Sequence, residues 1–262
     1  MKGDSQIEAL ALDRYLPQRR LVGLGPVEFR LHHATVCVIG AGGVASGCLP
    51  YLVGAGIKHL IIIDDDHVEL QNLHRQTLHI EERVGTNKAE SAAQRLKELN
   101  GTVRITAVPL RFGPNTSNVL DEYSPIDCLI DTVDNPQTRL FIATETHARR
   151  IPLVHAAATA FTITITTLIP SHEDLPCLRC LYRTVPSEQI RSTSLEHGIF
   201  GPAAGLAGVL AASEALKLCS LGPQHDALLA GRLLVLNLLN LHVRVLPFPK
   251  LPMCPYCGDN AS

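Results

Sequence analysis

The sequence predicts an α/β fold of the Rossmann-like, doubly wound type, in which antiparallel strands extend a mostly parallel sheet. Two observations support this expectation. Short apolar runs of strand type alternate with helical segments over the first 158 residues, and such alternation implies parallel βαβ units. From Phe161 to Thr166, apolar and polar residues alternate with a period of two, which is typical of half-exposed antiparallel strands.

The first half of the chain contains the expected parallel strands and two helices. The first helix has small residues on its packing side, and the second has apolar residues at helical spacing. The expected strands are residues 35–39, 59–64, 103–108, 126–131 and 152–155, and the expected helices are residues 44–55 and 88–100.

For the second half of the chain, the sequence predicts antiparallel strands and one long helix in place of alternating strands and helices. A strand at residues 161–166 precedes a loop-like stretch at residues 170–200. The helix expected at residues 202–218 is rich in Gly and Ala, which lets it pack closely against a neighbour. Two final strands are expected at residues 233–236 and 241–245. The sequence shows no repeat, low-complexity segment or clear linker.

Composition and charge exclude several classes of protein. The chain has 262 residues, 46% of them hydrophobic and 18% charged, which describes a globular protein with a filled core. A net charge of −2 gives no field that favours nucleic acid or an acidic membrane surface. Residues 1–20 are too polar for a secretory signal, and the apolar runs are interrupted before about 18 residues. We therefore expect a cytoplasmic protein, in which eight cysteines indicate metal or sulfur chemistry.

A glycine-rich turn follows the first expected strand. Gly40, Gly42 and Gly43 precede the first expected helix, and Ala45 occupies the last position of the turn pattern. Glycines there let backbone N–H groups approach a phosphate at a helix N-terminus. Asp64, at the end of the next strand, stands where a carboxylate can hold a ribose hydroxyl. The pattern fits nicotinamide, flavin and ATP enzymes alike, and a tight turn without a ligand also has this pattern.

Polar residues downstream favour an ATP enzyme. They are Asp66, Asn72, Arg75, Lys88 and Asp134. Attack of a carboxylate on the α-phosphate of ATP builds negative charge, so fixed cations and a magnesium ion lower the barrier. Asp134 follows a parallel strand, at the edge where such sheets bind ligands. Taken singly, Asp64 could cap a helix, and Arg75 and Lys88 could be solvated surface charges.

These motifs resemble the ThiF/MoeB/HesA adenylyltransferases, bacterial relatives of the ubiquitin-activating enzymes. The resemblance covers almost the whole chain. It rests on Arg14-Tyr15, the glycine turn, Asp64 to Gln76, Lys88, Thr132 to Asn135, Pro176-Cys177-x-x-Cys180 and Cys254-x-x-Cys257-Gly258.

The resemblance implies roles for these residues and a reaction for the protein. Asp64 holds the ribose, Asn72, Arg75 and Lys88 contact the phosphates, and Asp134 holds Mg²⁺. The implied reaction is ATP-dependent adenylation of the C-terminal carboxylate of a ubiquitin-like sulfur-carrier protein ending in Gly-Gly, with release of pyrophosphate. A persulfide sulfur donor then acts on the acyl-AMP to make a thiocarboxylate. The resemblance also implies a homodimer, in which residues 14–20 contribute three arginines to the partner's site.

The same resemblance divides the chain. Residues 1–33 are expected to form a charged, helical N-terminal arm, and residues 34–262 a single adenylation domain of the ThiF type. Its nucleotide-binding half is residues 34–158. Its other half, residues 159–262, holds the antiparallel strands, a peripheral cysteine site and a crossover region.

Four cysteines form two closely spaced pairs, Cys177 with Cys180 and Cys254 with Cys257. This short spacing places both sulfurs of a pair on one metal, and four thiolates complete a closed tetrahedral zinc site. Four unliganded cysteines in a reducing compartment are the alternative. The remaining cysteines, Cys37, Cys48, Cys128 and Cys219, lie in expected strands or helices and are interpreted as core residues.

Two departures from the family pattern affect the expected chemistry. Ser194 stands where some members have a catalytic cysteine, and a serine hydroxyl without a dedicated base is a poor substitute for a thiolate. We therefore expect a free acyl-adenylate and no thioester at this position. Pro17 stands where the family has a further arginine, for which Arg19 or Arg20 are possible substitutes.

Three other functions remain open at this point. One is adenylation of a ribosomal peptide, although the N-terminal arm is short for a peptide-binding domain. Another is a non-catalytic family scaffold, which Pro17 and Ser194 favour and Arg75, Lys88 and Asp134 oppose. The third is a nicotinamide oxidoreductase.

Overall fold

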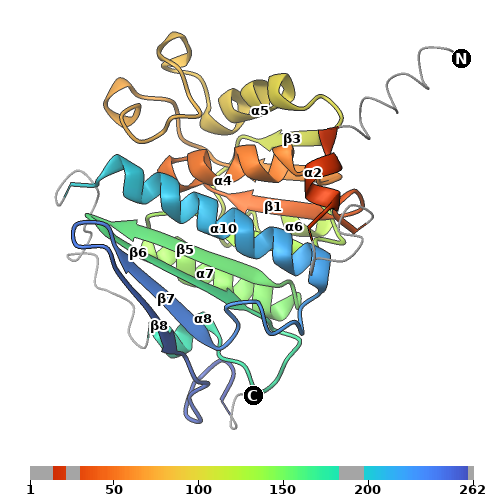
Figure 1. Cartoon of the computed structure of the whole chain (residues 1–262), viewed down its shortest axis with the longest axis vertical. Coiled ribbons are helices and arrows are strands. Elements are labelled where there is room, and N and C mark those ends of the chain that lie inside the picture. Colours follow the sequence, from red (N-terminus) through yellow and green to blue (C-terminus); the bar gives the residue numbers. More distant parts are fainter. Residues whose placement is uncertain (1–13, 22–29, 183–197, 259–262) are drawn as a thin grey trace, which may run out of the picture.

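The computed structural model describes residues 14–21, 30–182 and 198–258. Their strands form one mixed sheet in the order β3-β2-β1-β4-β5-β6-β7-β8 (Figure 1). The first five strands in chain order pair in parallel, and β6, β7 and β8 are added antiparallel. The strands are β1 Thr35–Ile39, β2 His59–Ile63, β3 Arg104–Val108, β4 Cys128–Asp131, β5 Leu153–Thr159, β6 Thr162–Leu168, β7 Arg232–Asn237 and β8 His242–Pro247.

Helices cover both faces of the sheet. On one face lie α4 Gly43–Gly54, α5 Lys88–Leu99 and α10 Gly201–Leu221, and on the other α6 Val119–Glu122, α7 Pro136–Ala148 and α8 Leu178–Leu181 (Figure 1). Three other short helices are α2 Leu16–Arg19, η1 Leu70–Asn72 and η2 Glu81–Arg83. Each face of the sheet has its own hydrophobic core, and alternate residues of β1 point into each. Val36 and Val38 pack in the core that contains α4, whereas Cys37 and Ile39 pack in the core that contains α7.

The α/β fold with a mixed sheet is confirmed, and the expected strands agree with the observed ones within a few residues. Strand β5 is longer than expected and continues to Thr159, where it turns directly into β6. Helix α7 was not expected from the sequence, and α8 lies inside the stretch interpreted as a loop. The division of the chain into an arm and a domain stays a prediction.

Helices α4 and α10 touch backbone to backbone. A Cβ atom added at Gly208 of α10 would collide with the backbone at Val44 and Cys48 of α4, and one added at Gly47 would collide with Gly205. The abundance of Gly and Ala expected to permit close packing therefore does so at defined positions. By length and composition α10 could cross a membrane, but half of its apolar stretch is buried inside the protein.

The described part of the N-terminal arm packs against the body of the protein. Tyr15 is buried, and its hydroxyl accepts a hydrogen bond of 2.8 Å from the Asn100 side chain at the end of α5. Its ring fills the space beside Gly56. Pro17 lies in the first turn of α2, where a residue without an N–H is well tolerated. This region is thus anchored to its own chain.

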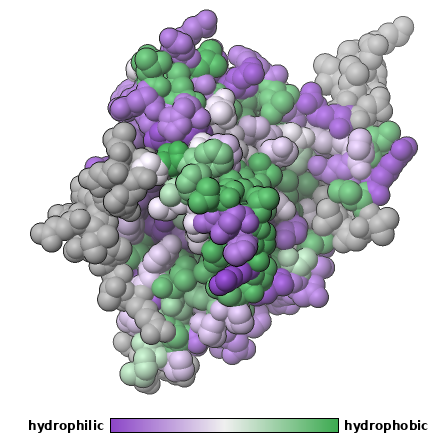
Figure 2. Space-filling model, turned by 60° about the vertical axis from the view of Figure 1, so that its left-hand side comes forward, coloured by the Kyte–Doolittle hydropathy of each residue, from purple (hydrophilic) through white to green (hydrophobic). Residues whose placement is uncertain are grey.

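Exposed apolar side chains gather on the β7–β8 hairpin. Leu239 and Leu241 in its turn are 71% and 74% exposed, and Val243 and Val245 of β8 are also largely exposed. The turn lies at the left of Figure 1, and Figure 2, which brings that side forward, shows hydrophobic side chains near the centre of this face. Strands β1, β4 and β5 are parallel and β7 runs in the same direction, so all four end at the same edge of the sheet as this turn.

Candidate active site

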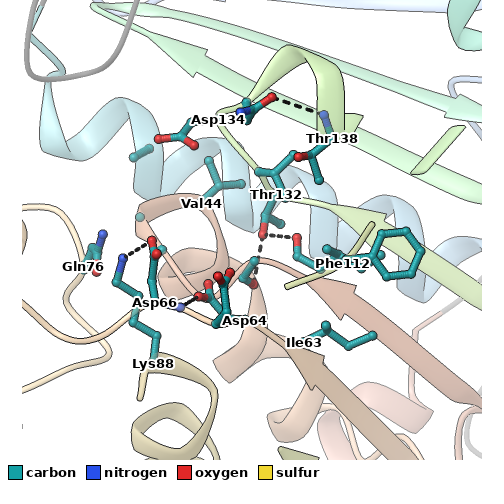
Figure 3. A pocket seen from close by; sticks show the side chains of 18 of the residues that line it. Val44, Ile63, Asp64, Asp66, Gln76, Lys88, Phe112, Thr132, Asp134 and Thr138 are labelled. Atoms are coloured by element: carbon teal, nitrogen blue, oxygen red, sulfur yellow. Dashed lines mark hydrogen bonds and ion pairs between the residues drawn. The ribbon is translucent and has the colours of Figure 1, made fainter. Parts of the chain in front are cut away.

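A cavity of about 330 Å³ opens where β1, β2 and β4 end (Figure 3). Strand order reverses between β1 and β4, and such a switch point is the usual ligand crevice of a doubly wound sheet. Eight of the nine nucleotide-site residues expected from the sequence line it: Gly40, Gly42, Gly43, Asp64, Asp66, Arg75, Lys88 and Asp134.

The glycine turn forms the floor of the cavity. Gly40 has a φ of +100°, and a Cβ there would lie 2.6 Å from the Thr132 hydroxyl. That hydroxyl donates to the Ile39 carbonyl at 2.9 Å, which joins the ends of β1 and β4. Helix α4 begins at Gly43 without a side-chain cap. Its first N–H groups can therefore donate hydrogen bonds to an anionic oxygen.

Asp64 fixes this turn and keeps acceptor capacity. Its carboxylate accepts hydrogen bonds from the N–H groups of Ala41 at 2.6 Å and Asp66 at 2.8 Å. Burial raises the pKa of Asp64, and these two hydrogen bonds oppose the rise. Each carboxylate oxygen has a second lone pair, so Asp64 can also accept from a ribose hydroxyl.

Lys88 and Asp66 form an unequal ion pair. The Lys88 ammonium lies 3.0 Å from the Asp66 carboxylate, with 8% of the lysine side chain and 69% of the aspartate side chain exposed. Figure 3 shows the ammonium directed at this carboxylate. Lys88 is the first residue of α5, and Asn87 caps the helix through hydrogen bonds from Ala89 and Glu90. The cation is therefore held rigidly, whereas its partner can turn towards solvent.

Asn72 lies behind Arg75 and not on the cavity wall. The Arg75 guanidinium donates to the Asn72 side-chain oxygen at 2.8 Å, and the Asn72 amide donates to Glu69 at 2.9 Å. Burial lowers the pKa of Arg75, which the charges of Asp134 and Glu69 oppose. In this arrangement Asn72 orients the guanidinium that faces the cavity.

Gln76 is a cavity residue to which sequence reasoning gave no role. It is only 4% exposed and lines the cavity. Its side-chain oxygen has no hydrogen-bond partner among the described residues. A buried acceptor without a donor is unusual in a folded protein, so this oxygen is available to accept from a group in the cavity. The signal available in the sequence was its position directly after Arg75.

An apolar wall completes the cavity. Ile39 and Ile63 end their strands there, Leu110 and Phe112 come from the segment after β3, and Val133 follows β4. A flat heterocycle such as adenine fits a wall of this kind. This segment could not be identified from the sequence, because only the fold brings it to the cavity at the end of β1.

The four paired cysteines converge at a second place. Their sulfur atoms all lie within 4.8 Å of one another, with 3.6 Å between Cys177 and Cys254 and 3.4 Å between Cys180 and Cys257. Tetrahedral coordination with zinc–sulfur bonds of about 2.3 Å requires sulfur–sulfur distances of about 3.8 Å. The cluster thus fits the expected metal.

The electrostatics of this cysteine centre also fit a metal site. Burial raises the pKa of Cys254, but N–H groups of Tyr256 and Cys257 and the neighbouring thiols outweigh it and lower the pKa to about 7. Burial raises the pKa values of Cys177 and Cys257. A metal cation offsets the cost of ionising such clustered thiols.

The remaining sequence predictions concern positions elsewhere. Cys37, Cys48 and Cys128 are buried in the core as expected, and Cys219 is partly buried. Ser194 lies outside the described residues.

Comparison with known proteins gives a consistent result. The ThiF family matches residues 17–256. The chain is 36% identical over 254 residues to the SAMP-activating enzyme E1 of Haloferax volcanii, covering 97% of this chain and 91% of the relative. It is 38% identical over 256 residues to the sulfur carrier protein adenylyltransferase of Thermus thermophilus, covering 96% and 92%.

Solved structures share the fold. E. coli MccB with ATP superimposes with a TM-score of 0.76 at 21% identity, covering 88% of this chain and 69% of that chain. From the extent of the sequence matches and the assembled cavity, the chain belongs to the ThiF family.

Proposed function

We propose that the protein is an ATP-dependent adenylyltransferase that activates the C-terminal carboxylate of a ubiquitin-like sulfur-carrier protein as acyl-AMP and releases pyrophosphate. The observation that carries this proposal is the meeting of two held cations, Arg75 and Lys88, with the first turn of α4 in one cavity. The names of relatives that match nearly the full chain support the substrate class.

The arrangement suits nucleophilic attack at an α-phosphate. In the proposed binding mode adenine lies on the apolar wall, and Asp64 accepts from the ribose. The phosphates then lie over the glycine turn, within reach of Arg75 and Lys88. These cations stabilise the charge that develops on the phosphate oxygens as the carboxylate attacks, and they do so without reorganising. Asp66 leaves Lys88 as phosphate oxygens take its place.

The carboxylates beside the cavity fit a magnesium ion. Asp134 is exposed at the end of β4 and Asp66 is exposed after β2, and carboxylates are preferred ligands of Mg²⁺. When bound, Mg²⁺ neutralises charge on the phosphates. We also propose that Cys177, Cys180, Cys254 and Cys257 hold one structural Zn²⁺, for which four thiolates provide a closed site.

Three further proposals come with this function. The acyl-adenylate forms without a thioester at Ser194. The outer sulfur of a persulfide donor then displaces AMP to give an acyl disulfide, and a thiol cleaves this to the thiocarboxylate with formation of a disulfide. The protein works in the cytoplasm. It forms a homodimer in which arginines of residues 14–20 approach the partner's site. Arg14 donates to the Leu99 carbonyl of its own chain at 3.1 Å. A monomer at micromolar concentration in sedimentation would contradict the last proposal.

ATP–pyrophosphate exchange tests the function. The protein, Mg²⁺ and ATP are mixed with a ubiquitin-like carrier ending in Gly-Gly, or with the same carrier lacking its last glycine. We expect exchange only with the intact carrier, and mass spectrometry should show the carrier plus AMP. Exchange that depends on a short peptide and not on any carrier would replace the proposed substrate. Absence of ATP binding would reject the reaction itself.

A further inference from the structure

A buried polar network lies beside the cavity and is not part of its wall. The Asp131 carboxylate accepts from the Arg139 guanidinium at 3.0 Å and contacts the Nδ1 atom of His155 at 2.8 Å. The other ring nitrogen of His155 lies 3.2 Å from the Tyr182 hydroxyl. Arg139 also donates to the Val133 carbonyl. The side chains of Asp131 and His155 are fully buried, and that of Arg139 is 11% exposed.

The hydrogen-bonding capacities define the direction of each contact. A carboxylate only accepts, so the Nδ1 atom of His155 carries the proton that Asp131 receives. In a neutral imidazole the Nε2 atom is then an acceptor, so Tyr182 donates its hydroxyl proton. Each of the four side chains therefore depends on its neighbour, and removing the Tyr182 hydroxyl leaves a buried acceptor without a partner.

The two ends of the network lie at different functional centres. At one end, Asp131 accepts from the Val133 N–H at 3.1 Å and Arg139 donates to the carbonyl of the same residue. Both contacts shape the turn that carries Asp134 into the cavity. At the other end, Tyr182 is the C-cap of the single helical turn α8, whose N-cap is Cys177 and which contains Cys180.

We propose that Asp131, Arg139, His155 and Tyr182 form a positioning network through which the cysteine centre sets the turn at Val133 and Asp134, and so the affinity of the site for the divalent cation bound with ATP. The inference rests on the proposed function. A charged pair inside a core is often no more stabilising than apolar packing of the same volume, so we attribute to positioning a network that links β4, α7, β5 and the end of α8. None of its four residues lines the cavity.

The test uses Mn²⁺ as a paramagnetic substitute for Mg²⁺. Binding of Mn²⁺ to the protein in the presence of ATP is measured by electron paramagnetic resonance for Tyr182→Phe, which removes one hydroxyl. We expect an affinity about fivefold weaker than in the unaltered protein, the effect of one buried hydrogen bond. The matched control is Tyr256→Phe, because Tyr256 also lies at the cysteine centre but its hydroxyl contacts only Arg179 among the contacts described. This control should bind Mn²⁺ normally.

Two further measurements separate positioning from simple stabilisation. His155→Gln retains a donor for Asp131 and an acceptor for Tyr182 and should keep near-normal Mn²⁺ affinity, whereas His155→Leu should lose it. Chelation of the metal at the cysteine centre should weaken Mn²⁺ binding in the unaltered protein. In Tyr182→Phe, chelation should cause little further loss of Mn²⁺ affinity, because both changes act through the same network.

The outcomes distinguish this inference from the proposed function. Unchanged Mn²⁺ affinity in Tyr182→Phe, with exchange intact in the unaltered protein, would overturn the network alone. An unaltered protein that binds no Mn²⁺ with ATP would overturn both. Additive effects of chelation and Tyr182→Phe would show two independent paths and would also overturn the proposed coupling.

Discussion

Lys88 enters the cavity from the first position of α5 with almost none of its side chain in solvent. Among the described residues, its ion-pair partner is the exposed Asp66. An ammonium held this way keeps its position when the carboxylate leaves, so it meets a phosphate with little loss of side-chain entropy. Arg75 is held comparably, because Asn72 accepts from its guanidinium.

Lys88→Ala should lower ATP–pyrophosphate exchange by about a hundredfold or more, because one charge contact with the developing phosphate charge is lost. The matched control is Lys97→Ala, since Lys97 is an exposed lysine near the other end of the same helix. Equal exchange in the two variants would remove Lys88 from the mechanism. Circular dichroism of both proteins checks that α5 is retained.

For single residues, the sequence predicted which residues lie at the cavity better than it predicted which side chains contact one another. Residues such as Asp64 and Asp134 were predictable because strands of a parallel sheet end at one edge, whatever the loops do. The orientation of Asn72 towards Arg75 depends on the geometry of η1, and sequence spacing does not define it. The network around Asp131 was equally inaccessible, because its members come from four separate elements.

Among the elements, α4 and α10 are the most tightly coupled pair. Gly205 and Gly208 lie on the same helix, yet an added Cβ at Gly205 meets nothing within 4 Å, while one at Gly208 collides with α4. Gly208→Ala should therefore destabilise the fold by at least about 2 kcal/mol through overpacking. Gly205→Ala should be neutral or stabilise by up to about 1 kcal/mol through helix propensity.

Urea unfolding of the two glycine variants checks this prediction, with the free energy of unfolding as the quantity compared. Equal stability of both would mean that the helices can move apart without cost. The expectation from the sequence was only that α10 packs closely. Which glycine is indispensable depends on the crossing point, which only the structure provides.

The second element with a testable role is the turn of α8 between Cys177 and Cys180. We predict one zinc per chain in protein purified without added metal. Cys254→Ser should lose the metal and lower Tm by at least about 5 °C, because metal binding is coupled to folding. Cys219→Ser, a cysteine of α10 outside the cluster, should retain both metal and Tm. Full zinc content in Cys254→Ser would show that another residue completes the site.

Helix α7 shows where element prediction failed. Its start was signalled by Asn135 followed by Pro136, and the Asn135 side chain does accept from two backbone N–H groups. Its interior mixes apolar and polar residues without a clear apolar stripe, because one side packs on the sheet while Arg139 reaches into the buried network. Helical periodicity is therefore weak over these residues.

At the scale of the whole molecule, buried histidines make stability depend on pH. Burial lowers the pKa of His155, and it lowers the pKa of His79, whose ring nitrogens contact the Ala41 carbonyl and the Ser91 hydroxyl. In the unfolded chain both titrate near 6.5. As pH falls below that value, the unfolded state binds protons that the folded state does not, so stability is lost on acidification.

We therefore expect Tm to fall between about pH 7 and pH 5. His79→Gln should make the pH dependence of Tm less steep, because one lowered pKa is removed. His172→Gln, which changes an exposed histidine, should leave it as in the unaltered protein. Zinc content must be followed in parallel, since acid also releases metal from thiolates. A Tm that does not change over this range would contradict the expectation.

The sequence predicted that the sheet has parallel and antiparallel strands, but not that all of them belong to one continuous sheet. Alternating strands and helices predicted the parallel half, and a period of two predicted the antiparallel half. The joining of both halves into one sheet follows from the tight turn between β5 and β6. That turn carries Ala160 at a φ of +49°, a conformation that an alanine does not signal in a sequence.

The backbone contact between α4 and α10 also affects how a nucleotide binds. The same packing continues to the cavity, where Gly43 lies against Ala204 and the backbone of Arg75, and Gly201 lies against His74. This close packing holds in place the surface that we propose receives the phosphates. Its ordering entropy belongs to folding and not to association. Calorimetry of ATP binding should accordingly show a small heat-capacity change, because little additional surface is buried by rearrangement of this end of the protein.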